Sequence, residues 1–289
     1  MKPVDTVSDG AALAYMRYRR ATYFFGDRGP ALPHGTQARW RLTVSEPQGW
    51  HANMVGFIQG SGDEIADVID IARDWFTQHR VDTWVDADEW TPLFMRPDIL
   101  EQREFQLIDD WDMCICRRLP QPPANSAVQL EWAHQGNDLQ LAAWVAEQID
   151  SSTPLALDAL PVLRRLARYR TELRDGFCRF ALARLDGQVV GSGRVTNERV
   201  PVVVGIATLP GARNHGVATA TTAFLTAYAL QQRGIGALYV DRGSQAARLY
   251  GRLGYSALFR TCAWRRPYLE AAPAQTTDGT NACTELPTM

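Results

Sequence analysis

The sequence predicts an α/β fold in two consecutive domains, each with a mostly antiparallel mixed sheet that contains one parallel pair of strands and is flanked by helices. The β-branched run 202–209 is typical of a buried strand, and a glycine-containing loop and a long helical pattern follow it. The order strand, helix, strand, helix, strand occurs twice, at 51–116 and again from 202 to 266. The proline-rich segment 120–126 separates the two copies.

Composition places the chain among globular proteins. It has 289 residues, 46% hydrophobic and 21% charged, a length comfortable for two domains. The 30 basic and 32 acidic residues leave a formal charge of −2, which does not favour a nucleic-acid partner. No apolar run approaches the roughly 18 residues that span a bilayer. Residues 1–10 lack the apolar core of a signal peptide, so we expect a cytoplasmic monomer or homodimer with no membrane contact.

In the N-terminal half, hydrophobic spacing and turn residues predict the elements in order. Residues 11–22 favour a helix, and Arg17, Arg19 and Arg20 on it indicate either a substrate- or phosphate-binding patch or a solvated face. The following elements are a strand at 37–45, a turn at 47–49, a strand at 51–58 paired with it as a hairpin, a helix at 63–78, a strand at 81–85, a partly helical segment at 91–104 and a strand at 106–116.

The C-terminal half contains the clearest local signal. Asp186-Gly187 lies between two alternating segments, which predicts a tight hairpin. The other predicted elements are a strand at 128–133, helices at 137–149 and 155–173, hairpin strands at 177–185 and 188–196, the central strand 202–209, a long helix after Gly216 that Gly234 ends, and a strand at 237–241. The composition of 267–289 predicts a disordered tail.

The loop before the long helix is a candidate anion site. Residues 213–218 join a strand to a helix N-terminus, where backbone N–H groups have no intrahelical partner and the helix dipole adds positive charge. Gly216 and Ala218 leave room for a phosphate to approach the backbone. The alternative is an ordinary connection with an incidental glycine.

Two motifs in order carry a family resemblance. R-N-H-G-V-A at 213–218 fits the Q/R-x-x-G-x-G/A signature of the GNAT superfamily of acyl-CoA-dependent N-acetyltransferases. A-A-R-L-Y-G-R-L-G-Y at 246–255 resembles that family's A-x-x-L-Y-x-x-x-G-F/Y segment. The resemblance covers residues 127–266. Ser244 is a departure, because family members often have Asn in that loop.

The resemblance implies acetyl-CoA, or another acyl-CoA, as co-substrate and no metal. The pantetheine would bond to the edge of the central strand, and the pyrophosphate would lie on the following loop. The residues carried over as cofactor-binding are Ile206, Ala207, Thr208, Arg213, Asn214, His215, Gly216, Val217, Ala218, Thr219 and Ser244. A backbone N–H near Ala207 would stabilise the negative charge on the acetyl oxygen.

The resemblance also implies direct transfer, in a ternary complex, to a primary amine of a small molecule. Tyr250 would protonate the leaving CoA thiolate, unless it is only an aromatic that packs its helix against the sheet. The stretch 202–208 carries no carboxylate, so a base could only be Glu198, Glu147 or Asp150 through water, or the reaction needs no strong base. The alternatives are an acyl-thioester enzyme that loads an acyl carrier or decarboxylates, and a non-catalytic acyl-CoA-binding module.

The N-terminal half is interpreted as a degenerate GNAT-like copy. If Val85-Asp86 is placed on Val240-Asp241 and Phe105 on Tyr255, Leu100 stands where the second half has Tyr250. The loop 58–63 lacks an arginine and enters its helix with Asp63-Glu64, which would repel a pyrophosphate. The predicted organisation is a degenerate domain at 1–119, a linker at 120–126, a catalytic domain at 127–266 and the tail.

The five cysteines do not indicate a metal centre. Cys114 and Cys116 would share one face of a strand, but they have no second Cys/His pair nearby to complete a zinc site. Cys178 and Cys262 fall in predicted strands, where cysteine packs as a small apolar residue.

Overall fold

The computed structural model describes residues 7–23, 29–33, 35–42, 53–119, 127–134, 136–151 and 153–268. The predicted linker, the turn at 47–49 and all but two residues of the tail lie outside the described residues. The elements are α1 (Asp9–Tyr23), β1 (Gln37–Arg41), β2 (Met54–Gln59), α2 (Gly62–Gln78), β3 (Thr83–Asp88), the 3₁₀ turn η1 (Pro92–Met95), α3 (Pro97–Glu101), β4 (Gln106–Cys116), β5 (Val128–Ala133), α4 (Asn137–Asp150), α5 (Leu160–Arg174), β6 (Cys178–Leu185), β7 (Gln188–Thr196), β8 (Val203–Thr208), η2 (Pro210–Ala212), α6 (Val217–Arg233), β9 (Gly236–Asp241), α7 (Gln245–Arg252) and β10 (Ser256–Arg266).

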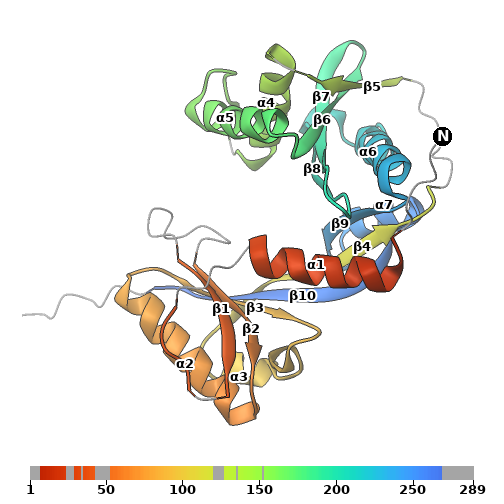
Figure 1. Ribbon diagram of the computed structural model, residues 1–289. Coiled ribbons are helices and arrows are strands. Elements are labelled where there is room, and N and C mark those ends of the chain that lie inside the picture. The colour runs from red at the N-terminus through yellow and green to blue at the C-terminus, as the bar shows by residue number, and fades with distance from the viewer. Residues whose placement is uncertain are drawn as a thin grey trace, which may run out of the picture.

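The fold is mixed α/β, as predicted. One sheet has the strand order β1-β2-β3-β10-β4-β9 and the other β5-β6-β7-β8. β2 and β3 run parallel, and the other neighbouring strands in both sheets run antiparallel. A parallel bridge between Val202 and Ala237 links β8 to β9, so the two sheets meet at the middle of the molecule (Figure 1).

The last strand, β10, lies in the sheet of the N-terminal half. It pairs with β3 on one side and with β4 on the other, while β4 in turn pairs with β9. Figure 1 shows β10 running beneath α1 and across to β1–β3. The predicted bounds 1–119 and 127–266 stay a prediction, but the hydrogen-bonded sheet crosses them.

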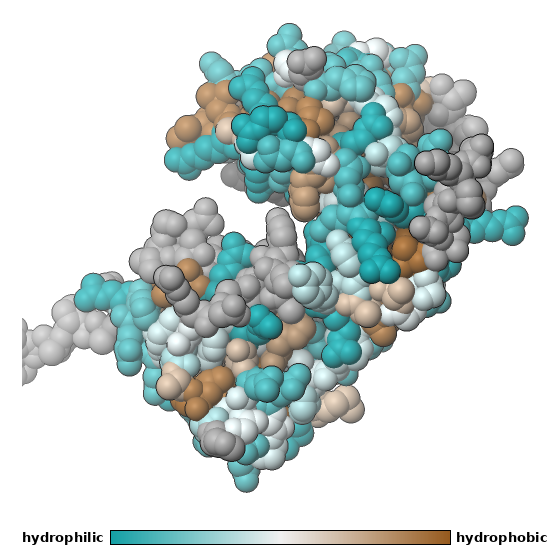
Figure 2. Space-filling model, in the orientation of Figure 1, coloured by the Kyte–Doolittle hydropathy of each residue, from teal (hydrophilic) through white to brown (hydrophobic). Residues whose placement is uncertain are grey.

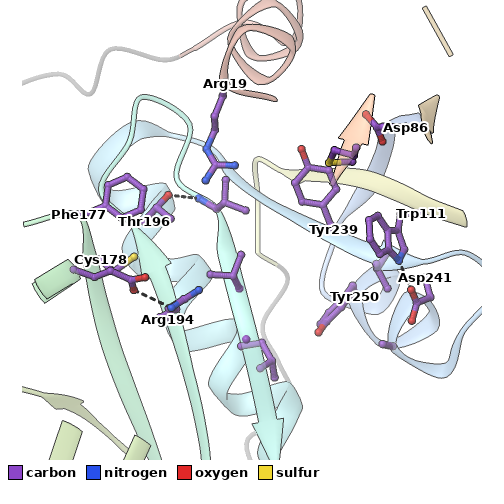
Figure 3. A pocket seen from close by; sticks show the side chains of 18 residues that line it. Arg19, Asp86, Trp111, Phe177, Cys178, Arg194, Thr196, Tyr239, Asp241 and Tyr250 are labelled. Carbon is purple, nitrogen blue, oxygen red and sulfur yellow. Dashed lines mark hydrogen bonds and ion pairs between the residues drawn. The ribbon is translucent and has the colours of Figure 1, made fainter. Parts of the chain in front are cut away.

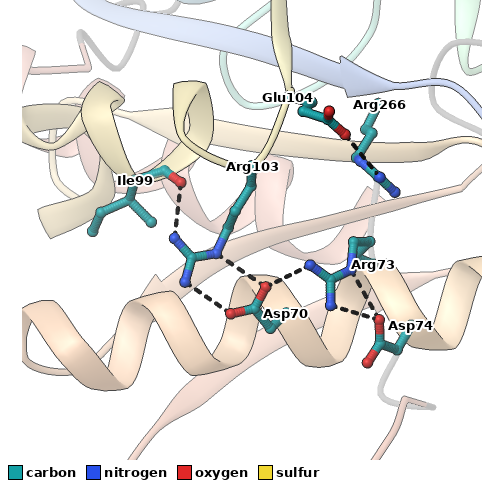
Figure 4. Close-up of polar contacts among 7 residues, drawn as sticks. All are labelled: Asp70, Arg73, Asp74, Ile99, Arg103, Glu104 and Arg266. Atoms are coloured by element: carbon teal, nitrogen blue, oxygen red, sulfur yellow. Dashed lines mark hydrogen bonds and ion pairs between the residues drawn. The ribbon is translucent and has the colours of Figure 1, made fainter.

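Helices α2 and α3 cover one face of the N-terminal part of this sheet. Ile65, Val68, Ile69, Ala72 and Phe76 of α2 are buried against apolar residues of β2, β3 and β10. Arg103 joins the two helices, because its Nη2 lies 2.8 Å from Asp70 Oδ2 and its Nη1 donates to the Ile99 carbonyl oxygen (Figure 4). Asp70 also accepts from Arg73, so it is the centre of a small ion-pair network.

Helix α1 packs on the opposite face of the sheet. Ala12 and Met16 are fully buried among Met113 of β4, Phe259 of β10 and residues 200–202 of the C-terminal half. The N-terminal helix therefore covers the junction between the two halves. Arg117 reinforces its start through an ion pair with Asp9.

The C-terminal half follows the sequence pattern with one correction. The hairpin forms as expected, with Asp186 and Gly187 in the left-handed region (φ 50° and 76°) that a tight turn requires. The second helix begins at Leu160, not at residue 155, because Pro161 favours the first turn of a helix and the segment before it is irregular. Gly234 ends α6 in the left-handed conformation, as predicted.

Candidate active site

The edge of β8 that faces β9 is open. β8 pairs with β7 through residues 203–208, whereas its contact with β9 in the described residues is the bridge at Val202 and the bond from Ala237 N–H to the Pro201 carbonyl. A bulge at Gly205, which has φ 65°, shifts the β7–β8 register. The backbone around Ile206 and Ala207 therefore faces a gap into which an extended ligand could add as a strand.

The N-terminus of α6 is an uncapped helix end. No side chain caps it, and Gly216 before it has φ 78°, which an L side chain adopts only with strain. Arg213, Asn214 and His215 are exposed, and His215 Nδ1 donates to the Arg213 carbonyl oxygen at 2.9 Å. The amides of the first turn are thus available to an anion.

The equivalent end of α2 is occupied by its own side chain. Ser61 N–H donates to Glu64 Oε2 at 2.6 Å, and this bond lowers the pKa of the Glu64 carboxyl. Leu100, at the position aligned with Tyr250, is fully buried in the core of the N-terminal half.

Tyr250 combines a packed ring with a hydroxyl at a cavity wall. It lies on α7, its ring centroid is 6.1 Å from that of Tyr255, and its side chain borders the cavity described next. Burial raises the pKa of the Tyr250 phenol, and the neighbouring Thr222 side chain opposes this shift. The phenol is therefore protonated throughout the neutral range.

A cavity of about 610 Å³ opens between the two sheets (Figure 3). One wall comes from β6, β7 and β8, and the other from β2, β3, β4 and β9; α1 contributes Arg19. The surface is visibly hollowed between the two halves of the molecule (Figure 2). Side chains of both halves line the cavity, including Ile206 and Tyr250 from one and Asp86 and Trp111 from the other.

Both arginines that line the cavity are ion-paired. Arg19 Nε lies 2.8 and 2.7 Å from the two carboxylate oxygens of Glu198, and these side chains are only 11% and 13% exposed. Arg194 Nη1 lies 2.8 Å from Glu172 Oε2. Glu198 is thus the anchor of α1 on the loop after β7, and its assignment as a base stays a prediction. Of the two further bases considered, Glu147 is ion-paired with Arg165, and the side chain of Asp150 lies outside the described ones.

The other predicted cofactor residues are placed as follows. Ala207 is buried, and Thr208 at the end of β8 has a buried hydroxyl without a hydrogen-bond partner among the described residues. Val217 is buried, while Ala218 and Thr219 are partly exposed in the first turn of α6. The Ser244 hydroxyl accepts from Ala247 N–H at 3.0 Å and so caps α7.

The sequence prediction missed the acidic wall of the cavity. Asp86 on β3 and Asp241 on β9 both line it, and they are the two aspartates that the internal alignment places together. Trp111 on β4 also lines it, and its indole N–H donates to Asp241. An aspartate within a mainly buried strand was a usable signal in both halves, because charged side chains are rarely buried unless they have a partner or a function.

Residues 133–255 match the model of the acetyltransferase (GNAT) family. The match spans 123 of the 289 residues, which is less than half of the chain. The match contains β6–β9, α6 and α7, and therefore the open strand edge, the uncapped helix end and Tyr250. No curated protein matches the chain.

Solved structures show the same fold over most of the chain. A GCN5-related N-acetyltransferase from Kribbella flavida is 17% identical, with 91% of this chain and 96% of that chain covered and a TM-score of 0.63. One from Sphaerobacter thermophilus is 16% identical, with 82% and 78% covered and a TM-score of 0.64. A tandem GNAT protein from the clavulanic acid biosynthesis pathway is 14% identical, with 93% and 98% covered and a TM-score of 0.54.

The described residues contain no group of three or more His, Cys, Asp or Glu side chains arranged to hold a metal ion. None of the helices within them combines the length and the apolar character that crossing a membrane requires.

Proposed function

We propose that this chain is an N-acetyltransferase that uses acetyl-CoA to acetylate a primary amine of a small molecule by direct attack in a ternary complex. One observation carries the proposal. The open edge of β8 runs from the cavity, which Gly205 and Ile206 line, to the uncapped N-terminus of α6. A thioester arm and a pyrophosphate need these two features in this order.

The residues present fit acetyl-CoA. The loop 213–216 and the first turn of α6 offer backbone amides to a pyrophosphate, and Arg213 adds an exposed positive charge. The free edge of β8 offers N–H and C=O groups at Ile206 to Thr208 to the amides of the pantetheine. When bound, acetyl-CoA supplies the activated acyl thioester.

The chain's own groups then have separate tasks. The backbone N–H near Ala207 stabilises the charge that grows on the acetyl oxygen. The Tyr250 hydroxyl gives its proton to the departing sulfur, and its raised pKa keeps that proton in place until transfer. The cavity walls hold the amine against the thioester, which supplies much of the acceleration without a strong base.

We infer a tandem arrangement in which the N-terminal half has lost its own cofactor site. The Glu64 carboxylate already occupies the end of α2 that a pyrophosphate would need. Calorimetric titration should therefore give one acetyl-CoA per chain, and Glu64→Gln should leave the affinity unchanged. A stoichiometry of two would contradict this inference.

Mass spectrometry of reaction products tests the function. The purified chain is incubated with acetyl-CoA and a panel of small amines, and in parallel with malonyl-CoA alone and with an acyl carrier protein. An acetylated amine supports the proposal. Release of carbon dioxide from malonyl-CoA, or acylation of the carrier, would replace it by thioester chemistry. Tight acetyl-CoA binding with no product from any arm would indicate a binding module.

A further inference from the structure

We propose that the N-terminal half selects the acceptor, and that the acceptor is a small polycation. Asp109 and Trp111 on β4, with Asp241 beside them, would hold one ammonium group while a second amine faces β8. This inference rests on the proposed function and names the class of its acceptor. It follows from the charge balance of the cavity, from strand register and from the aromatic side chains on the same wall.

Carboxylates outnumber cations around the cavity. Its two lining arginines are neutralised by Glu198 and Glu172. Asp86 and Asp241 are carboxylates of the opposite wall, where Asp86 accepts a hydrogen bond from the Thr261 hydroxyl and Asp241 accepts one from the Trp111 indole. A neutral or anionic acceptor would gain nothing from this wall, whereas an acceptor with two ammonium groups would be attracted to it.

Strand register places a third carboxylate on that wall. Within 109–112 the β4–β10 pairing is regular, so Asp109 and Trp111 project from the same face of the sheet and Asp110 and Asp112 from the other. Trp111 pairs with Asp241 across β4 and β9, so Asp109, two residues before Trp111 on the same face, lies diagonally opposite Asp241. Burial, and then the charge of Asp241, raises the pKa of Asp109. Two like charges held together bind a cation better than either does alone.

Asp86 extends the acidic wall towards the N-terminal edge. Ala263 of β10 pairs with Asp86 on one side and with Asp109 on the other, so the three residues lie in one row across the sheet. Two strand spacings separate the backbones of the aspartates by about 10 Å. This span suits a molecule with amines at both ends of a short chain or ring.

Two tryptophans lie on or behind this wall. The Trp111 ring lines the cavity beside Asp241, and an indole face together with carboxylates is a usual environment for an ammonium group. Trp84, two residues before Asp86 on β3, packs against Met54 of the cavity wall. Its Nε1 is buried without a hydrogen-bond partner among the described residues, but Trp84 does not line the cavity, so Trp111 is the tryptophan of this wall that a ligand can reach.

Steady-state acetylation with paired amines tests the proposal. The dications are spermidine and 2-deoxystreptamine, a linear and a cyclic frame, and the singly charged amines are n-hexylamine and glucosamine. We expect kcat/KM at least about tenfold higher for one or both dications, the size of one favourable charge contact. Asp109→Asn and Asp241→Asn should each raise KM for that dication about tenfold, with kcat nearly unchanged. In both variants, KM for the singly charged amines should change little.

Asp112→Asn is the matched control, because it removes the same charge from the same strand but from the opposite face. It should leave KM for every amine unchanged. Asp109→Asn also separates binding from folding. Relief of its repulsion with Asp241 should leave the melting temperature equal or higher, so a raised KM could not be attributed to a damaged fold.

Calorimetric titration of the CoA-saturated protein with the dications measures acceptor binding separately from acetylation. It therefore distinguishes failure of the polycation proposal from failure of the acetyltransferase proposal. Equal kcat/KM for single-charge amines and dications, unaffected by the two variants, would overturn the polycation proposal and leave the acetyltransferase in place. Dication binding that Asp109→Asn and Asp241→Asn weaken, without acetylation of any amine, would overturn the acetyltransferase and support the recognition wall.

Discussion

Tyr250 can be tested as an acid separately from its packing. Tyr250→Phe keeps the ring and removes only the hydroxyl, so fold and acetyl-CoA affinity should be nearly unchanged. If the hydroxyl protonates the thiolate, kcat should fall by roughly 10²–10⁴-fold, the range for a positioned general acid. Tyr250→Ala should in addition destabilise the protein by about 3–5 kcal/mol through the cavity that it leaves. Stopped-time acetylation assays and urea unfolding measure the two effects.

A Phe variant with full activity would remove Tyr250 from the mechanism. The raised pKa of the phenol adds a second criterion. Because burial raises the pKa of the phenol above its ordinary value, the rate should show no loss from Tyr250 ionisation at neutral and mildly alkaline pH. A decline with a midpoint below pH 9 that disappears in Tyr250→Phe would contradict the assigned environment.

The buried thiols should make the protein sensitive to alkali. Burial raises the pKa of Cys114 and of Cys262 to about 11 and that of Cys178 to about 12. Each pKa lies above that of a thiol in the unfolded chain. Above about pH 8.5 the unfolded state therefore releases protons that the folded state keeps, and the free energy of unfolding falls as pH rises. Urea unfolding at pH 7, 8.5 and 10 should show a free energy that falls only above pH 8.5. Cys178→Ala should reduce that fall, and an identical decline in this variant would contradict the assignment.

At the scale of single residues, the sequence shows a side chain's chemistry more readily than its surroundings. Gly216 was located by its place between a strand and a helical pattern, Tyr250 by the family resemblance, and Asp186-Gly187 by its turn chemistry. Glu198 was recognised as a carboxylate near the site, but its partner Arg19 lies 179 positions away, and no local pattern encodes that contact. Asp241 was used only as an alignment anchor, although it lines the cavity.

At the scale of elements, the β8–α6 connection carries the cofactor prediction. Gly216→Glu places a side chain and a negative charge at the helix end, so acetyl-CoA binding should be lost in calorimetry. Gly216→Ala is the control for backbone strain. It forces a residue with a Cβ atom into the left-handed conformation of this position (φ 78°), at a cost of about 1–2 kcal/mol, but it adds no charge. We expect the Ala variant to bind at reduced affinity. Unchanged affinity in the Glu variant would exclude this loop as the pyrophosphate site.

Element boundaries were predictable where the stop signal is local. Gly234 ends α6, and β4 spans the residues expected from its alternation. The start of α5 was wrong because leucines at helical spacing continue through 155–159, whereas Pro161 sets the first turn. The splayed pair β8 and β9 was expected from the family resemblance alone, since strand spacing along a sequence contains no information about hydrogen-bond partners.

At the scale of the whole molecule, the exchange of strands decides what can fold alone. A sequence shows that 106–116 and 256–266 are strands, but each could pair within its own half. In the structure β10 lies between β3 and β4, and β4 pairs with one edge of β9. The C-terminal half therefore depends on a strand from the N-terminal half, and the cavity is lined by residues of both halves.

This exchange predicts that residues 127–266 do not fold as a monomer. Without β4, strand β9 has an open edge and β10 has no neighbour, and such edges associate with other chains. Phe259 and Trp264 of β10, 2% and 8% exposed in the intact protein, would lose their packing in two separate cores. Each loss costs about 3–5 kcal/mol, and the two together approach the 5–15 kcal/mol that usually stabilises a domain.

Expression of the fragment alone, and together with residues 1–119, measures this dependence. The isolated fragment should aggregate or form swapped oligomers and show no cooperative melting, whereas the co-expressed halves should purify as one complex that binds acetyl-CoA. The intact chain should melt in a single transition, since β10 belongs to the core of both halves. A monomeric 127–266 fragment with cooperative melting and unimpaired acetyl-CoA binding would show that the strand exchange is dispensable, and the N-terminal half would then contribute only to the acceptor side of the cavity.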